Sequence, residues 1–424
     1  MSHEIAQFVV VTGSDFDFDQ VRQSHQIVSL SFEPTFSGEC LSGSAILRAA
    51  KVVIVPRSVR RLGAGCFALS EALECVSFQL GSQLEYIGER CFYKCALLKR
   101  VEGWPSRGTQ HAVFCISPRC STVPQSDAKS LLRIAPGVVQ SAGNHCFSGC
   151  PLLGHIEIPA NVEVIGTYCF GPSEHSSGGF GSCEPLADQC CSSLARVTFA
   201  PGSILRVIEK GAFMRSGLIE ITIPCTLESI GEECFRYCKS LRVVTFESGS
   251  SLKTIGVGAF YSTSLSEVVI PSSVEVIGDR CFSGCGSLER VTFESGSSLK
   301  TIGWSAFSYT SLSEVAIPSS VEVMVDECFS GCKSLRVVTF ESGSSLKTIG
   351  EYAFFKTSLS EVAIPSSVEV IGGFCFRECK SLHKVTFESG SSLKTIGEGA
   401  FSGTSLSEVA IPSSVEVIGD RCFN

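Results

Sequence analysis

Residues 252–298 read LKTIGVGAFYSTSLSEVVIPSSVEVIGDRCFSGCGSLERVTFESGSS, and this stretch decides the fold because it repeats almost unchanged to the C-terminus. A shift of 47 residues superimposes, without an insertion or deletion, a series of phenylalanines: Phe246, Phe293, Phe340 and Phe387. Each unit is a doublet, since the skeleton L-x-x-I-G-x-x-A/C-F begins at Leu252 and again at Val274, and successive starts alternate between 22 and 25 residues apart. Such self-similarity predicts a solenoid in which each coil packs on its neighbours.

Each coil can be assembled from recurring short motifs. The pattern L-x-x-V-x-I, at Leu265, Val268 and Ile270, predicts a short strand whose last two apolar residues point inward. Pro271 lacks a backbone N–H and ends that strand on a turn. The glycine before each Ala/Cys–Phe pair is expected where a side chain would hinder the backbone. The phenylalanine of each pair should fill the coil opposite the strand and stack as a spine, represented here by Phe260, Phe282 and Phe307.

Length, charge and hydropathy exclude several classes of protein. A chain of 424 residues exceeds one ordinary globular core, but a solenoid needs no central core. The net charge of −8 argues against a nucleic-acid partner, which would require a clustered basic face. The longest apolar runs, such as residues 8–11 and 52–55, are far shorter than the ~20 residues of a membrane helix. The N-terminus has no basic n-region and no apolar h-region, so no classical signal peptide is expected.

The 23 cysteines are expected to be reduced structural thiols. Most follow the frame C-F-x-x-C, as at Cys281 and Cys285, and the intervening half-repeats place alanine and threonine there, so these positions are filled by size. Cysteines 47 residues apart lie two coils apart, roughly 9.5 Å at the strand spacing, whereas a disulfide needs Cα atoms within about 7 Å. Two pairs on neighbouring coils are possible exceptions: Cys66 with Cys91, and Cys146 with Cys169.

The array is not regular throughout the chain. Residues 1–44 do not fit the repeat and are expected to form an N-terminal cap or leader, and the solenoid is expected to cover residues 45–424. Residues 103–130 predict an irregular coil, and the Gly/Ser/Pro-rich residues 171–190 predict a surface loop insertion. The sequence stops in mid-coil at Asn424, so the last coil is expected to be truncated and the chain to be a fragment.

Residues 270–288, IPSSVEVIGDRCFSGCGSL, closely resemble the half-repeat of the BspA-like leucine-rich repeat proteins. The resemblance covers residues from about 45 to 424, because the elements I-P-x-S-V, I-G-x-x-A/C-F and F-x-x-C-x-x-L recur in order. It implies an α/β leucine-rich repeat solenoid of about 15 coils with a parallel strand ladder on one face. It also implies a surface antigen or adhesin that binds host or matrix proteins. Met324 and Val325 replace the usual Ile-Gly, so local strain is expected there.

The charged residues are expected to neutralise one another. One column alternates in sign from coil to coil: Lys253, Glu275, Lys300, Glu322, Lys347, Glu369, Lys394 and Glu416. A second column, on the strand, includes Glu267, Arg290, Glu314, Val337, Glu361, Lys384 and Glu408. Opposite charges on adjacent strands contribute a few tenths to about 1 kcal/mol each. These columns therefore favour a role in register and solubility over an extended polar contact stripe.

No catalytic or cofactor-binding constellation is recognisable. The seven histidines share no repeat position and show no metal-ligand spacing. In the predicted loop insertion, the potential zinc ligands match no standard pattern, which favours a plain loop over a metal site: His175, Cys183, Asp188, Cys190 and Cys191. The sequence therefore predicts a protein that is not an enzyme and that has no cofactor.

Among near-identical units, the positions that vary flank the Ala/Cys–Phe pair. Five aromatic residues there are candidate protein-binding residues, expected to gather away from the strands: Trp304, Tyr309, Tyr352, Phe355 and Phe374. Exposed aromatics are enriched at protein interfaces, although drift at unconstrained surface sites is the plainer explanation. The leading hypothesis is a non-enzymatic protein-binding solenoid, at the cell surface by resemblance. The alternative is an intracellular scaffold or regulatory module within a longer polypeptide.

Overall fold

The structure, a computed structural model, describes residues 8–11, 29–32, 50–55, 61–78, 86–102, 141–142, 144–160, 162–172 and 190–424. The chain forms two compact units, Met1–Leu218 (unit 1) and Ile219–Asn424 (unit 2). The predicted cap at 1–44, irregular coil at 103–130 and loop insertion at 171–190 fall largely outside the described residues. These assignments, like the truncated last coil, stay predictions.

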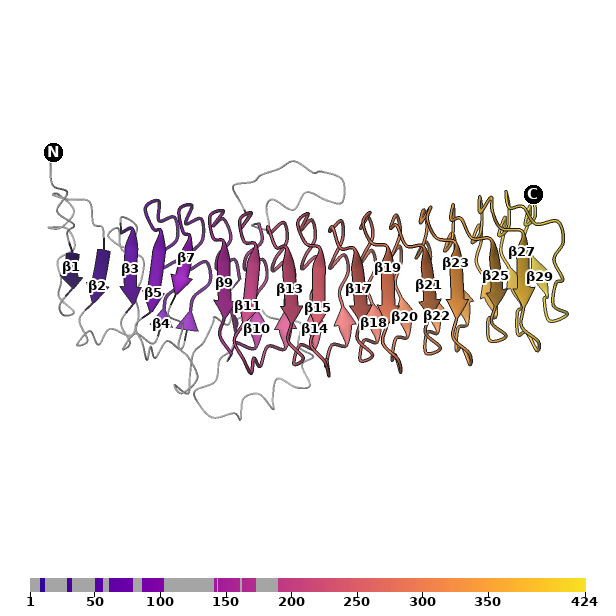
Figure 1. The fold of residues 1–424 in the computed structure, drawn as a ribbon, viewed down its shortest axis with the longest axis horizontal. Coiled ribbons are helices and arrows are strands. Elements are labelled where there is room, and N and C mark those ends of the chain that lie inside the picture. The colour runs from indigo at the N-terminus through magenta and orange to yellow at the C-terminus, as the bar shows by residue number, and fades with distance from the viewer. Residues whose placement is uncertain are drawn as a thin grey trace. The chain divides into compact units, whose positions relative to one another are not determined.

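Unit 1 consists of long strands that alternate with two-residue strands (Figure 1). The strands are β1 (Phe8–Val11), β2 (Ser29–Phe32), β3 (Val52–Val55), β4 (Arg61–Leu62), β5 (Cys75–Phe78), β6 (Tyr86–Ile87), β7 (Arg100–Glu102), β8 (Ser141–Ala142), β9 (His155–Ile158), β10 (Val164–Ile165), β11 (Arg196–Phe199) and β12 (Val207–Ile208). The long strands pair in parallel in the orders β1-β2-β3-β5-β7 and β9-β11, and the short strands in the orders β4-β6 and β8-β10-β12.

Unit 2 shows the same alternation from β13 to β28, after which a second short strand, β29, follows without a long strand between them. The strands are β13 (Glu220–Ile223), β14 (Ser229–Ile230), β15 (Val243–Phe246), β16 (Thr254–Ile255), β17 (Glu267–Ile270), β18 (Val276–Ile277), β19 (Arg290–Phe293), β20 (Thr301–Ile302), β21 (Glu314–Ile317), β22 (Val323–Met324), β23 (Val337–Phe340), β24 (Thr348–Ile349), β25 (Glu361–Ile364), β26 (Val370–Ile371), β27 (Lys384–Phe387), β28 (Thr395–Ile396) and β29 (Val417–Ile418). The long strands form the pairs β13-β15, β17-β19, β21-β23 and β25-β27, and the short strands one parallel ladder from β14 to β29.

The strand register follows directly from the repeat. Glu267 lies opposite Arg290 and Ile270 opposite Phe293 in the β17–β19 pair, and the copies 47 residues later pair in the same way. Along β17 the side chains alternate between exposed and buried, as expected of strands with one face on the core. The apolar positions of the L-x-x-V-x-I pattern are therefore the inward-facing ones.

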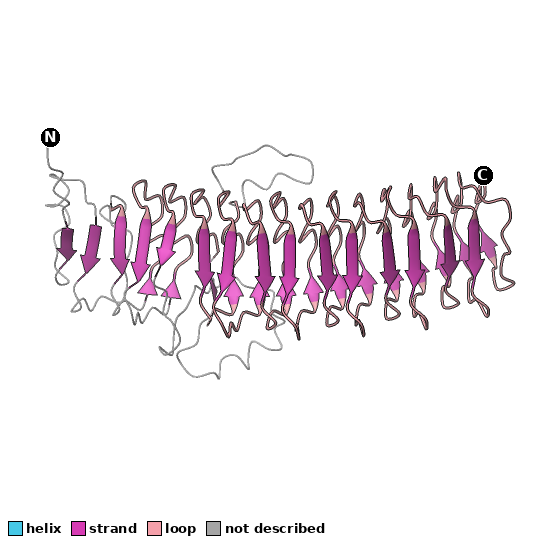
Figure 2. Cartoon of the chain, viewed as in Figure 1, coloured by secondary structure: helices cyan, strands magenta, loops and turns pink. Residues whose placement is uncertain are grey.

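Two details of the predicted fold class are wrong. No helix occurs among the described residues, so the architecture is a β-solenoid rather than an α/β solenoid (Figure 2). The segment after each short strand instead donates backbone hydrogen bonds to the next coil, as from Phe282 N to Ala306 O at 2.7 Å and from Gly284 N to Ser308 O at 2.9 Å. Because these bonds satisfy the backbone between coils, no helical bonds within a coil are needed.

The number of coils is about 13 rather than about 15. None of the described segments forms a helix long and apolar enough to cross a lipid bilayer.

The predicted phenylalanine spine is confirmed in both units. In unit 1 the rings of Phe67, Phe92, Phe147, Phe170 and Phe213 stack with centroids 5.1–5.2 Å apart. In unit 2 the stack runs from Phe235 to Phe423 with one ring per coil. Most of these rings are fully buried. The spine is thus the continuous core of each unit.

The distance between neighbouring coils also depends on the glycine that precedes the Ala/Cys–Phe pair. A Cβ atom on Gly303 would lie 2.7 Å from the carbonyl carbon of Gly278 in the preceding coil. A side chain is therefore disfavoured at this position because the backbones of two neighbouring coils approach each other closely. Val325 occupies this position in one coil and still donates to Ile302 O at 2.9 Å, as the glycines do to their own partners.

Buried thiols fill the rest of the core, as expected from their alternation with alanine and threonine. The described cysteines, including Cys66, Cys91, Cys146 and Cys169, are thiols rather than disulfides, and all but Cys225 are buried. Many thiols also donate to the spine of the preceding coil, as from Cys332 Sγ to Phe307 O at 3.1 Å. The thiols therefore pack as small apolar groups that satisfy a backbone carbonyl.

Because the thiols are buried, we expect the protein to lose stability at alkaline pH. Burial raises the pKa of the Cys332 thiol from 9.0 to about 11, and the same cause raises the pKa of Cys379 to about 11. Above pH 9 the unfolded thiol ionises while the folded thiol stays protonated, so the contribution to stability is complete below pH 9 and is lost towards pH 11. Each such thiol should lower the free energy of unfolding by up to ~2.7 kcal/mol over that range, measured by urea denaturation.

The control is Cys332→Thr, which reproduces the residue found at Thr310 in the preceding coil. Tyrosines and lysines also titrate in this range, so the difference between wild type and variant is the relevant quantity. If the free energy of unfolding falls equally with pH in wild type and in Cys332→Thr, ionisation of the Cys332 thiol does not cause the loss.

Candidate functional site

The charged columns pair as the sequence predicts. Lys253 lies 2.9 Å from Glu275, and Lys300 lies 2.8 Å from Glu322. Further along, Glu369 contacts two lysines, one in each neighbouring coil, which lowers the pKa of its carboxyl group. On the long strands the pairs are Arg290–Glu267 and Lys384–Glu361. Because all these side chains are exposed, each pair contributes little to stability, and the columns act mainly in register and solubility.

The candidate aromatic residues lie in the segment that joins each short strand to the next long strand. We call the two positions before and the two after each Ala/Cys–Phe pair the loop row; in one coil these are residues 304, 305, 308 and 309. Their side chains flank the buried spine; in this coil Ser305 and Ser308 are buried, whereas across unit 2 most loop-row residues are half-buried or exposed. The loop row is therefore the part of each coil where side chains can vary without disturbing the core.

The structure brings three of the five candidates together. The ring of Tyr352 stacks on Phe374 of the next coil with centroids 5.0 Å apart, and it meets Phe355 edge to face at 5.5 Å. Two cations cover this cluster, with Lys356 Nζ 4.8 Å from the Phe355 ring and Arg377 5.3 Å from the Phe374 ring. We call Tyr352, Phe355 and Phe374 the aromatic cluster.

The other two candidates lie on one coil, two coils before Tyr352. Arg280 of the preceding coil lies over the Trp304 ring at 4.2 Å, and Asp279 Oδ1 accepts a hydrogen bond from Trp304 N at 2.8 Å. The Tyr309 side chain is 64% exposed. Trp304 is therefore held in place by its neighbours, whereas Tyr309 is largely exposed.

The backbone at three of these aromatic residues is left-handed. Tyr309, Tyr352 and Phe374 have φ angles of 57°, 53° and 55°. For a bulky side chain this region costs of order 1 kcal/mol or more, and glycine avoids the cost. Glycine does occupy the same positions in other coils, as at Gly258 and Gly284. Polar residues such as Arg280 and Glu327 adopt it as well, so the left-handed backbone is a property of the repeat and does not distinguish the aromatic residues.

Two of these rings also lie across a glycine in the next coil. A Cβ atom on Gly331 would come 2.7 Å from Cε1 of Tyr309, and one on Gly399 would come 2.6 Å from Cε1 of Phe374. Each ring therefore needs the absence of a side chain in its neighbour. An aromatic residue on one coil and a glycine on the next therefore fix the direction in which the ring points.

Sequence reasoning missed a second cluster in the loop row of unit 2. Tyr237 and Tyr261 meet edge to face at 5.5 Å, and the Arg236 guanidinium lies 4.9 Å from one ring and 5.3 Å from the other. Arg236 also forms an ion pair with Glu233. Tyr237 lies before the region of near-identical repeats, so comparing identical copies did not reveal it. The sequence does identify Tyr237 in another way, because it is the second residue after Phe235 of a Cys–Phe pair and so belongs to the loop row.

The structure offers no support for metal chemistry in the part of the chain it describes. No group of three or more His, Cys, Asp or Glu side chains there is arranged to hold a metal ion. Of the potential zinc ligands in the loop insertion, Cys190 and Cys191 are described and buried, and the other three lie outside the described residues. Cys191 Sγ donates to Phe147 O at 3.1 Å, so it joins the thiols of the core.

Comparison with known proteins agrees with the repeat pattern. Residues 43–111, 130–205, 206–336 and 300–424 match the BspA-type leucine-rich repeat region. No curated protein is similar enough in sequence to count as a match. A leucine-rich repeat protein from Bacteroides ovatus is 25% identical, with a TM-score of 0.58 over 93% of this chain and 84% of that one.

Two further solved structures are more distant. The pneumococcal vaccine antigen PcpA is 22% identical, with a TM-score of 0.39 over 66% of this chain and 79% of that one. A leucine-rich cell surface protein from Faecalibacterium prausnitzii is 20% identical, with a TM-score of 0.37 over 87% of each chain. The fold comparison therefore depends on the Bacteroides protein.

Proposed function

Since this chain belongs to the BspA-type leucine-rich repeat family, we propose that it is a non-enzymatic protein that binds other proteins through the loop row of unit 2. The family resemblance extends this proposal to a surface antigen or adhesin that contacts host or matrix proteins. The repeat architecture supports binding as the function, because a solenoid presents an extended surface and no enclosed active site.

The observation that carries the proposal is the aromatic cluster, in which Tyr352 and Phe374 of adjacent coils come together. Their rings contact each other and carry cations at their edges. Aromatic and arginine side chains are the groups that most often contribute the largest binding energies at protein interfaces. A cluster of this composition is therefore a suitable contact surface for a protein partner.

The test is a binding screen with the full chain. The immobilised protein is exposed to a panel of purified host and matrix proteins, and binding is measured by surface plasmon resonance. A double variant, Tyr352→Gly and Phe374→Gly, should weaken any specific interaction at least about tenfold, because two anchor residues are lost. The matched control is Glu267→Gln on β17, outside the loop row, which should leave affinity within about twofold. Equal affinity of the double variant and wild type would refute the assigned surface.

Replacing Tyr309 with glycine should separate stability from binding. The substitution removes a left-handed conformation that costs a tyrosine of order 1 kcal/mol, and the ring is largely exposed, so little burial is lost. We expect the free energy of unfolding to rise by up to about 1 kcal/mol, measured by urea denaturation. Affinity for a partner found in the screen should fall. A fall in stability instead would show that the Tyr309 ring packs on Gly331 as part of the fold.

A further inference from the structure

An apolar patch lies on the surface of unit 1, on the segment that joins each Cys–Phe pair to the following long strand. It covers consecutive coils, because the rings of Phe67, Phe92 and Phe147 stack at 5.1–5.2 Å. The apolar residues that are exposed or half-buried on this segment are Leu69, Ala72, Ala96, Leu97, Pro151 and Leu152. We call these residues the aliphatic patch.

The leucines of the aliphatic patch are open to solvent although the repeat does not require an apolar residue there. Leu69 is 52% exposed, Leu97 is 40% exposed and Leu152 is 41% exposed. Leu97 and Leu152 each stand two residues after the second cysteine of the C-F-x-x-C frame. The residues at this position in unit 2 are all serines: Ser240, Ser287, Ser334 and Ser381. Because the repeat accepts serine at this position, packing within the coil does not explain the two leucines.

Two charged residues at the patch form no ion pair within the described residues. Lys94 is exposed, and its Nζ atom lies 5.3 Å from the centre of the Tyr93 ring. A Cβ atom on Gly149 would come 2.8 Å from Cγ of Lys94, so the lysine side chain crosses to the next coil. Glu71 is also exposed and stands between Leu69 and Ala72 in the chain. The patch therefore offers one cation and one carboxylate to a partner.

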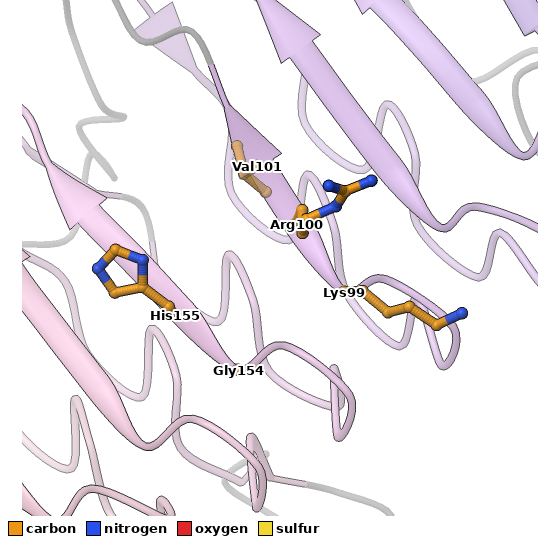
Figure 3. A pocket seen from close by; sticks show the side chains of 5 residues that line it. All are labelled: Lys99, Arg100, Val101, Gly154 and His155. Carbon is orange, nitrogen blue, oxygen red and sulfur yellow. The ribbon is translucent and has the colours of Figure 1, made fainter.

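The edge of the patch nearest the long strands differs in this respect. A pocket of about 330 Å³ lies at this edge and is lined by Lys99, Arg100, Val101, Gly154 and His155 (Figure 3). Figure 3 shows that the Lys99 side chain extends away from Gly154. Its Nζ atom lies 2.9 Å from Oε2 of Glu74. Lys99 is therefore already paired, in contrast to Lys94.

The composition of the patch favours a second copy of this chain as its occupant. Interfaces between identical subunits are about 65% apolar, against about 57% for non-obligate interfaces between proteins. In a two-fold contact the same surface lies on both partners, so the leucines of one copy face those of the other. The same symmetry brings Lys94 of each copy towards Glu71 of the other, which pairs both charges. The patch is thus complementary to itself in polarity and in charge.

We propose that two copies of this chain associate through the aliphatic patch with two-fold symmetry. The patch has fewer residues than the about 20–30 a side of a standard interface, so the dimer is weak and reversible. It lies in unit 1 and shares no residue with the loop row of unit 2. If the loop row binds a partner as proposed above, a dimer presents it twice, which increases the avidity for a partner with repeated sites.

The experiment measures the mass of the full chain by sedimentation equilibrium over about 1–500 μM protein. We expect a monomer–dimer equilibrium in wild type. A double variant, Leu97→Ser and Leu152→Ser, places the serines of unit 2 in the patch. It should weaken the dimer at least about tenfold, because each substitution acts twice in a two-fold interface.

Two control variants separate the patch from other exposed apolar residues. The matched control is Val269→Thr on β17, where the valine is 49% exposed and lies in unit 2. Phe374→Gly tests the aromatic cluster of the proposed function. Both variants should dimerise within about twofold of wild type. A dimer weakened by Phe374→Gly and unchanged by the serine double variant would overturn the proposal, because association would then depend on the loop row.

The charges provide a second test that leaves the apolar residues in place. Lys94→Glu or Glu71→Lys alone brings like charges together across the two-fold axis, so each variant should self-associate at least about threefold more weakly than wild type. An equimolar mixture of the two variants restores opposite charges at both contacts. We expect this mixture to form a heterodimer with an affinity within about twofold of the wild-type dimer. Both positions are exposed, so the thermal unfolding of each variant should match that of wild type.

Three results would overturn the proposal. The first is a wild-type chain that stays monomeric at every concentration, which would leave the patch to a different protein or to another segment of this chain. The second is a serine double variant that dimerises as wild type does. The third is a mixture of Lys94→Glu and Glu71→Lys that associates no more tightly than either variant alone.

Discussion

Replacing Phe307 with alanine is expected to lower the free energy of unfolding by about 3–5 kcal/mol. The ring is fully buried and stacks between Phe282 at 5.2 Å and Phe329 at 5.3 Å. The substitution removes a large apolar side chain from the spine and leaves a cavity between two other rings. Because each coil packs only on its neighbours, there is no second core that could compensate.

The measurement is urea denaturation of the full chain, together with hydrogen exchange to locate the effect. Amides in the coils next to Phe307 should lose protection more than those at the far end of unit 2, since stability in a solenoid is a sum of neighbour contacts. The control is Phe340→Ala on β23, which removes a half-buried ring and should cost clearly less. Similar losses for the two variants would show that the stacked spine contributes no more than an ordinary strand residue.

Replacing Gly303 with alanine should lower the free energy of unfolding by about 1–3 kcal/mol, the usual cost of overpacking. The added Cβ would lie 2.7 Å from both the Gly278 carbonyl carbon and the Asp279 nitrogen. Both are backbone atoms, so they cannot rotate away as a side chain would. Relief requires a local shift of the backbone, of the kind that accommodates Val325 at this position of the next coil while its hydrogen bond to Ile302 O stays at 2.9 Å.

The matched control for this substitution is Gly286→Ala in the same repeat. A Cβ on Gly286 meets nothing within 4 Å, and the other copies place lysine at that position, as at Lys239 and Lys333. Thermal unfolding of the two variants should therefore differ by several degrees, with Gly286→Ala close to wild type. If Gly303→Ala is as stable as Gly286→Ala, the close backbone approach at Gly303 does not limit the distance between the two coils.

The architecture was largely predictable from the sequence because the repeat itself carries the information. Two-residue alternation at Val268 and Ile270 defines the inward face of a strand, and the unchanging Phe282 and Phe307 define the spine. The absence of helices was not predictable in this way. The hydrogen bonds that replace a helix run between coils, and a sequence pattern does not distinguish a bond to the next coil from a bond within the same coil.

The candidate site was predictable only as a set of positions. Variation among near-identical copies located Trp304, Tyr309, Tyr352, Phe355 and Phe374 in the loop row, but it did not indicate which of their rings touch. Their role in binding stays a proposal. Tyr237 was missed because it has no identical copy to be compared with.

The sequence alone determined the length of each coil, the residues of its core and the pairing of its charges, because these repeat at a fixed interval and depend on spacing along the chain. Only the tertiary structure decided which rings of the loop row meet, such as those of Tyr352 and Phe374. This contact depends on the distance between side chains of neighbouring coils, which the spacing along the chain does not give.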